Sequence, residues 1–187
     1  MNVIGIDASL TGTAACRIDS DSQGDHEMKV FRSPPASSLR GRIERYHKLV
    51  EEVERWTWQA GETAVVFIEG YSFASPQFAH QLGEYGGLLR AGLLKLVAEV
   101  IEVPPSSLKK FITGSGNAKK EQVIAHICRR WKHIFDTNDE ADAFGLVQFG
   151  LRYLGLAECD SNAQREVIEK LKNPAAKKSK KRKAVEA

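Results

Sequence analysis

Residues 3–15, VIGIDASLTGTAA, place an acidic residue at the end of the most strand-like segment of the chain. The valine and isoleucines before Asp7 favour a buried β-strand, and a turn rich in glycine and threonine follows it. Burying an ionised carboxylate costs several kcal/mol unless it is paired or binds a metal. We therefore expect a strand whose end carries a carboxylate with a function.

Strand-like and helix-like segments alternate along the rest of the chain. Apolar runs predict five strands, at Val3–Ile6, Thr13–Ile18, Met28–Arg32, Ala64–Ile68 and Glu99–Val103. Apolar residues at helical spacing predict helices over about residues 37–58 and 77–96, a short helix at 107–113, one around 123–131 and a last one from near Asn138. This order predicts an α/β fold, a mixed five-stranded sheet with helices on both faces.

The basic residues are concentrated at the C-terminus. Of the 187 residues, those from Pro174 onward include six basic and one acidic residue, which leaves a formal charge of −2 on the rest of the chain. We expect one domain over residues 1–157 and a polar extension over 158–187, whose end, about 174–187, is disordered. Such a tail adds non-specific affinity for DNA or serves only solubility; its basic residues are Lys177, Lys178, Lys180, Lys181, Arg182 and Lys183.

Nothing in the sequence indicates a membrane or an oxidising compartment. No apolar run approaches the roughly 18 residues of a membrane span, and no signal peptide is visible. The three cysteines, Cys16, Cys128 and Cys159, are far apart and form no CxxC pattern. These features predict reduced thiols and a cytoplasmic location.

Four carboxylates call for a common explanation. Glu69 ends a strand as Asp7 does, and strands paired in one sheet can bring both to one edge. Asp139 and Asp142 are three residues apart and share a helical face, although Asp139 alone could simply stabilise a helix N-terminus. Four crowded carboxylates need compensating positive charge, and oxygen ligands suit Mg²⁺ or Mn²⁺. Two such ions can clamp a phosphodiester during hydrolysis.

Four segments, in this order and at these distances, resemble the RuvC-type Holliday-junction resolvases of the RNase H-like superfamily. They are IGIDASLTGTA (4–14), VFIEGYSF (66–73), LKKFITGSGNAKKEQV (108–123) and DEADAFGLV (139–147). The resemblance, over about residues 1–155, implies a homodimeric crossover junction endodeoxyribonuclease that nicks four-way DNA junctions in symmetric pairs and leaves 5′-phosphates. It also implies two Mg²⁺ ions per site, replaceable by Mn²⁺, with the ligands Asp7, Glu69, Asp139 and Asp142.

The same resemblance assigns roles to lysines. Lys109 and Lys120 match basic residues that the family uses at the active centre and on the DNA backbone, with Lys120 in a catalytic role. A lysine is a mobile point charge that suits phosphate. Lys110 and Lys119 are direct neighbours, so the match can shift by one position, and we retain Lys119 as a DNA-binding candidate. The alternative is that these lysines are ordinary solvated side chains.

An aromatic residue near Glu69 has a further expected role. Phe73 matches a position where the family carries an aromatic that wedges against bases at the junction, and Tyr71 and Phe78 compete with it. Base–aromatic stacking is worth roughly 1–3 kcal/mol. The alternative is a surface or core phenylalanine. The basic tail and the long first hairpin loop are more similar to phage-encoded relatives, which are less selective among branched DNAs.

The glycine-rich helix predicted over residues 77–96 is a candidate dimer contact, because its glycines suggest a close approach of another backbone. Three other functions compete with junction resolution. A same-fold nuclease could act on forks, flaps, three-way junctions or RNA–DNA hybrids. A non-catalytic junction-binding protein would not need all four acids. A sugar-kinase or actin-like ATPase begins similarly, but it has two such domains and a second phosphate loop, for which this chain is too short.

Overall fold

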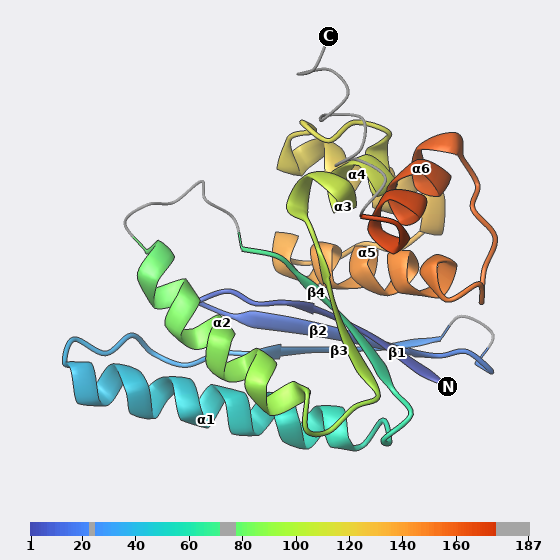
Figure 1. Ribbon diagram of the computed structural model, residues 1–187. Coiled ribbons are helices and arrows are strands. Elements are labelled where there is room, and N and C mark those ends of the chain that lie inside the picture. The colour runs from blue at the N-terminus through green and yellow to red at the C-terminus, as the bar shows by residue number, and fades with distance from the viewer. Residues whose placement is uncertain (23–24, 72–77, 175–187) are drawn as a thin grey trace, which may run out of the picture.

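The computed structural model describes residues 1–22, 25–71 and 78–174, and these form a mixed five-stranded sheet with helices on both faces (Figure 1). The sheet order is β3-β2-β1-β4-β5. Its strands β1 to β3 are antiparallel, whereas β4 and β5 run parallel to β1. The strands are β1 (Asn2–Asp7), β2 (Thr13–Asp19), β3 (His26–Phe31), β4 (Val65–Glu69) and β5 (Glu99–Val103). The predicted α/β class and the five strands are confirmed.

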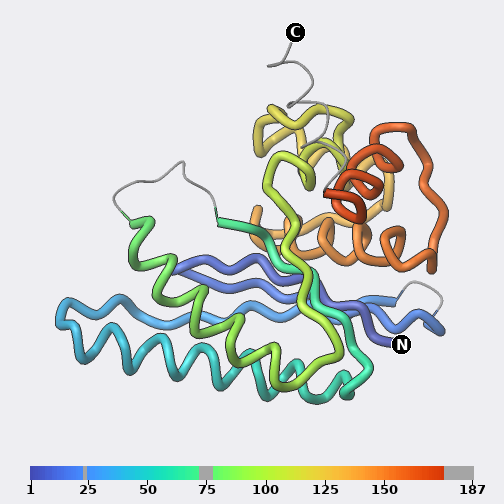
Figure 2. The backbone as a smooth tube through the Cα atoms, viewed as in Figure 1, coloured from blue at the N-terminus to red at the C-terminus, as the bar shows by residue number. Residues whose placement is uncertain are grey.

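The helices divide into two layers. The helices α1 (Leu39–Trp58) and α2 (Ala79–Leu93) cover one face of the sheet. The other face is covered by α5 (Asn138–Tyr153), with α3 (Pro105–Thr113), α4 (Lys120–Trp131) and α6 (Asn162–Lys172) packed around it. The backbone trace in Figure 2 shows the same two layers and the long path from β5 through α3 and α4 to α5. The predicted site residues Asp7 and Glu69 lie at the C-terminal ends of the neighbouring strands β1 and β4.

The helix α6 was not predicted, because only a few apolar residues stand among its charged ones. Ser161 caps its N-terminus, and Val167 and Ile168 are buried in the core shared with α3 and α5. Lys110 of α3 also forms an ion pair with Glu166, at 2.8 Å. The folded part of the chain therefore includes at least the residues up to the end of α6.

The first strand and α5 pack unusually closely, and a glycine makes this possible. A Cβ placed on Gly5 would overlap the carbonyl oxygen of Ala143 and lie 2.8 Å from the amide nitrogen of Val147. A residue with any side chain at this position would push α5 away from the sheet. Gly5 therefore sets the distance between β1 and the part of α5 that follows its first turn.

The glycines of α2 meet side chains or open space in the folded chain. The atoms nearest to Gly86 and Gly92 belong to side chains, those of Tyr71 and Arg90 and those of Glu54 and Val50, and nothing lies within 4 Å of a Cβ at Gly83 or Gly87. Within the described residues, no backbone of the same chain approaches these glycines, and the expected contact with a second copy stays a prediction.

No helix in the described ranges is long and apolar enough to cross a membrane. The three cysteines are all free, and Cys16 is buried.

Candidate active site

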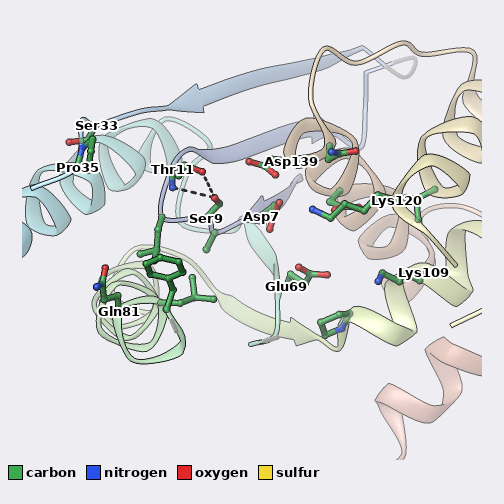
Figure 3. Close-up of a pocket in the computed structure, with 18 of the residues that line it drawn as sticks. Asp7, Ser9, Thr11, Ser33, Pro35, Glu69, Gln81, Lys109, Lys120 and Asp139 are labelled. Carbon is green, nitrogen blue, oxygen red and sulfur yellow. Dashed lines mark hydrogen bonds between the residues drawn. The ribbon is translucent and has the colours of Figure 1, made fainter. Parts of the chain in front are cut away.

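The four predicted carboxylates meet at one end of the sheet. The strands β1 and β4 are parallel neighbours, with Ile6 opposite Ile68, so the residues that follow, Asp7 and Glu69, lie side by side. A cavity of about 720 Å³ opens there, and Figure 3 shows acidic and basic side chains reaching into it from different elements. Its charged lining consists of Asp7, Glu69, Asp139, Asp142, Lys109, Lys120 and Arg45. The predicted convergence is confirmed in position.

Capping of α5 separates its acidic residues. The N-cap is Thr137: the Thr137 hydroxyl accepts from the Glu140 amide at 3.2 Å, and the Glu140 carboxylate accepts from the Thr137 amide at 2.9 Å. Glu140 therefore turns back to the cap. Asp139 and Asp142 remain to face the cavity.

Burial raises the pKa of all four carboxyl groups, and repulsion by the other site carboxylates adds to it for Asp7, Glu69 and Asp142. Burial, followed by the charges of Glu69, Asp142 and Asp139, raises the pKa of Asp7 well above its usual value. Burial raises the pKa of Glu69 to about 7 and that of Asp142 to about 6, against the opposing effect of Lys109 and Lys120. The pKa of Asp139 is also raised by burial. The cavity lining carries three cationic side chains, Lys109, Lys120 and Arg45, against four carboxylates, so with all four ionised the site attracts additional positive charge.

The chemistry of the donors fits hard divalent cations, because every acidic donor is a carboxylate oxygen. Within the described residues, no three acidic, histidine or cysteine side chains lie close enough to enclose one ion. The negative charges of these carboxylates also repel one another, which contributes to the raised pKa values of Asp7 and Glu69. The carboxylates are thus gathered at one place without being closed into a coordination cage.

Without divalent cations, we expect the protein to be more stable at about pH 6 than at about pH 8. Because the pKa of Glu69 is about 7 and that of Asp142 about 6, the folded chain binds more protons than the unfolded chain between these values and the usual carboxyl range. The stabilisation from this extra proton binding is fully present below the carboxyl pKa of the unfolded chain. It is lost as the pH rises through the pKa of the folded chain. Thermal unfolding in EDTA measures it, and Glu69→Gln should reduce the pH dependence. An unchanged dependence in that variant would show that the Glu69 carboxyl group is not its source.

Of the four lysines considered, two line the cavity and two do not. Lys109 on α3 and Lys120 at the start of α4 line the cavity. Lys119 is the exposed N-cap residue of α4 and is not part of the cavity lining, and Lys110 points to Glu166 instead. The choice of Lys109 and Lys120 over their neighbours is therefore supported by their positions.

Two arginines that no sequence motif indicates also lie at the site. Arg45 of α1 lines the cavity and donates to the carbonyl oxygen of Leu10, which holds the turn that follows Asp7. Arg32, just after β3, lowers the pKa of Asp139 against the effect of burial. In the sequence both resemble ordinary solvated arginines, and only the tertiary contacts distinguish them.

The aromatic candidates have different fates. Phe73 and the basic residues 177–183 lie outside the described residues. Tyr71 is held by α2, with the guanidinium of Arg90 4.3 Å from the centre of its ring. Phe78 is 53% exposed and lines the cavity, whereas Tyr71 does not line it. Of the two alternatives to Phe73, Phe78 is therefore better placed to stack on a base.

Comparisons with known proteins agree with this geometry. Residues 3–147 match the family model for crossover junction endodeoxyribonuclease RuvC. The RuvC proteins of Chlamydia muridarum and Sulfurovum sp. are 28% and 32% identical to the chain, over 78% and 69% of its length and 88% and 80% of theirs.

Solved structures share the fold. The Thermus thermophilus RuvC in complex with Holliday junction substrate aligns with a TM-score of 0.61 at 21% identity, over 84% of this chain and 98% of that one. The yeast mitochondrial Holliday junction resolvase Ydc2 aligns with a TM-score of 0.54 at 11% identity, over 91% and 83%. The fold is therefore RNase H-like, and with the match over residues 3–147 the chain belongs to the RuvC family of crossover junction endodeoxyribonucleases, the RuvC-type Holliday-junction resolvases.

Proposed function

We propose that this chain resolves four-way DNA junctions by metal-dependent hydrolysis, making paired symmetric nicks that leave 5′-phosphates. The observation that carries the proposal is the cavity in which Asp7, Glu69, Asp139 and Asp142 meet with Lys109 and Lys120. Family membership makes the chain a junction nuclease, and this cavity supplies the groups that such chemistry needs.

The four carboxylates would hold two Mg²⁺ ions, with Mn²⁺ as a substitute. Bound there, the metal supplies Lewis-acid stabilisation of the phosphodiester and activation of water. The donor oxygens stand on β1, β4 and α5; strand pairing joins β4 to β1, and the packing at Gly5 joins α5 to β1. Lys120, with Lys109 beside it, places positive charge where the phosphate becomes more negative during hydrolysis.

Junction binding requires groups beyond the cavity. Phe73, or Phe78 at the mouth of the cavity, would stack on bases at the branch point. Two symmetric cuts require two active sites related by a two-fold axis, so the proposal includes a homodimer, with α2 as the candidate contact. The substrate would be the DNA of a bacterial cell or of an infecting phage, so we propose that the protein acts in the cytoplasm.

A panel of substrates tests the proposal. Four-way, three-way, fork, flap, duplex and RNA–DNA hybrid substrates of the same sequence are incubated with the protein and magnesium. We expect the four-way junction to be cleaved fastest. Faster cleavage of flaps, forks or hybrids would favour a same-fold nuclease of other specificity, and binding of junctions without any cleavage would make the chain a non-catalytic junction-binding protein.

Removing residues 177–187 should weaken binding to all DNAs alike. The deletion takes away Lys177, Lys178, Lys180, Lys181, Arg182 and Lys183. Fewer released counterions should reduce the slope of log affinity against log salt, whereas preference for the four-way junction over duplex should survive. Fluorescence anisotropy across a salt series measures both quantities. Loss of the junction preference on deletion would show that the folded body is not the recognition element.

A further inference from the structure

One arginine outside the cavity connects three elements at the end of β4. Arg90 lies on α2 with its side chain only 14% exposed. Its Nη2 donates to the main-chain carbonyl of Glu69 at 2.9 Å, its Nη1 donates to the carbonyl of Gly86 at 3.1 Å, and its Nε donates to the carboxylate of Glu102 on β5. All three guanidinium nitrogens therefore have an acceptor, and one acceptor belongs to a residue with a carboxylate in the cavity.

The same guanidinium also covers the residue that leaves β4. The ring of Tyr71 lies under Arg90, 4.3 Å from its central carbon to the ring centre. A Cβ on Gly86 would lie 2.8 Å from both the Tyr71 ring and Nη1 of Arg90. Gly86 thus leaves the space in which the arginine and the tyrosine meet. This arrangement gives Gly86 a role within the chain that helix propensity alone would oppose.

The contact is with the main chain of Glu69, and its carboxylate faces elsewhere. The pKa of that carboxyl group is affected by burial and by Asp142, Lys109 and Lys120. On the other side of the strand end, the Gly70 amide donates to the carbonyl of Val103 at 2.9 Å. The backbone around Glu69 is therefore held from β5 on one side and from α2 on the other. Without Arg90, the hydrogen bond from α2 to the Glu69 carbonyl would be lost, and the hydrogen bond from Gly70 to Val103 of β5 would remain.

We propose that Arg90 is a positioning residue for Glu69: it fixes the main chain at the end of β4 and so the direction of the carboxylate. The proposal rests on the function proposed above for Glu69. An error of about 1 Å in the placement of a reacting group can lower a rate roughly 100-fold. Removing Arg90 should therefore slow cleavage while leaving DNA binding unchanged, because Arg90 does not line the cavity.

The variants Arg90→Gln and Arg90→Lys test this, and Arg42→Gln is the matched control. Arg42 lies on α1, and its side chain is 21% exposed. Like Arg90 it ties α2 to another element, because it bonds to Glu84 of α2 at 3.1 and 3.3 Å, but it forms no hydrogen bond to β4. The full chain is used throughout. Single-turnover cleavage of a four-way junction with magnesium, junction affinity in EDTA and thermal unfolding are measured for each variant.

We expect Arg90→Gln to cleave roughly 10- to 100-fold more slowly than the parent, with junction affinity within about twofold. Arg42→Gln should cleave at the parental rate with a similar change in Tm. Arg90→Lys should also be slow, because an ammonium group cannot reach all three acceptors at once, and it serves in place of Arg90→Gln if that variant does not fold. Parental rates in both Arg90 variants, or equal losses in Arg90→Gln and Arg42→Gln, would overturn the proposal.

Glu69→Gln separates the role of the carboxylate from the role of the arginine. If Glu69→Gln cleaves normally, the function proposed for the carboxylate fails, whatever Arg90 does. If Glu69→Gln is inactive and Arg90→Gln is as fast as the parent, only the role of Arg90 fails. Where both variants are slow, the double variant should be no slower than Glu69→Gln, because both changes act on one carboxylate.

Discussion

Asp7→Asn should lower the cleavage rate of a four-way junction by on the order of 10³-fold or more, with junction affinity nearly unchanged. The amide keeps the size of the side chain but removes the negative charge that a buried position, 9% exposed, retains only with a cation nearby. Phosphates are held by basic groups elsewhere, so binding should persist. Single-turnover cleavage with magnesium and anisotropy in EDTA measure the two effects.

The matched control for Asp7→Asn is Asp136→Asn. Asp136 is an exposed carboxylate just before α5 and does not line the cavity, so its removal should leave the rate unchanged. Because burial raises the pKa of Asp7 in the folded chain, an acid at this position costs stability at about pH 8, and Asp7→Asn should be more stable than the parent in EDTA. Near-parental turnover in Asp7→Asn would remove the basis for a metal-dependent centre at this place.

Gly5→Val should destabilise the fold more than any exchange of a surface residue. Its Cβ would overlap the carbonyl oxygen of Ala143 on α5, and neither backbone can move without displacing the other. Overpacking of this kind costs about 1–3 kcal/mol and occasionally more. Urea unfolding of Gly5→Val and of Gly5→Ala measures the loss, which should be smaller for the alanine.

The comparison for Gly5 is Gly83→Ala on α2. A Cβ at Gly83 meets nothing within 4 Å, so alanine should stabilise the helix by up to about 1 kcal/mol. If Gly5→Ala leaves the free energy of unfolding unchanged, α5 is not held against β1 as described. If it unfolds more easily and cleavage falls by more than the folded fraction does, close packing at Gly5 is a requirement for the site, whereas a loss in proportion to the folded fraction makes it a requirement for the fold alone.

Much of the site could be predicted because its residues stand at positions that local pattern defines. Asp7 and Glu69 each end an apolar run, and Asp139 and Asp142 share a helical face. Their convergence required in addition that β1 and β4 be neighbours and that α5 pack against β1. The order of strands and helices follows from the same patterns.

The rest depends on contacts between elements distant in sequence. Arg45 and Arg90 lie on helices where an arginine ordinarily faces solvent, and their roles become visible only through the carbonyls of Leu10 and Glu69. The helix α6 was not predicted for a related reason: it is mostly charged, and its pairing with α3 through Lys110 and Glu166 has no local signature.

The positions of the nicks on a fixed four-way junction test the central claim most directly. A junction that cannot branch-migrate is labelled on each strand in turn, incubated with the protein and magnesium, and the products are mapped and offered to a ligase. We predict nicks at symmetric positions on two opposite strands, with 5′-phosphates that ligate, and none with the Asp142→Asn protein. Single unpaired nicks, products that do not ligate, or undiminished cutting by the Asp142→Asn protein would contradict this claim.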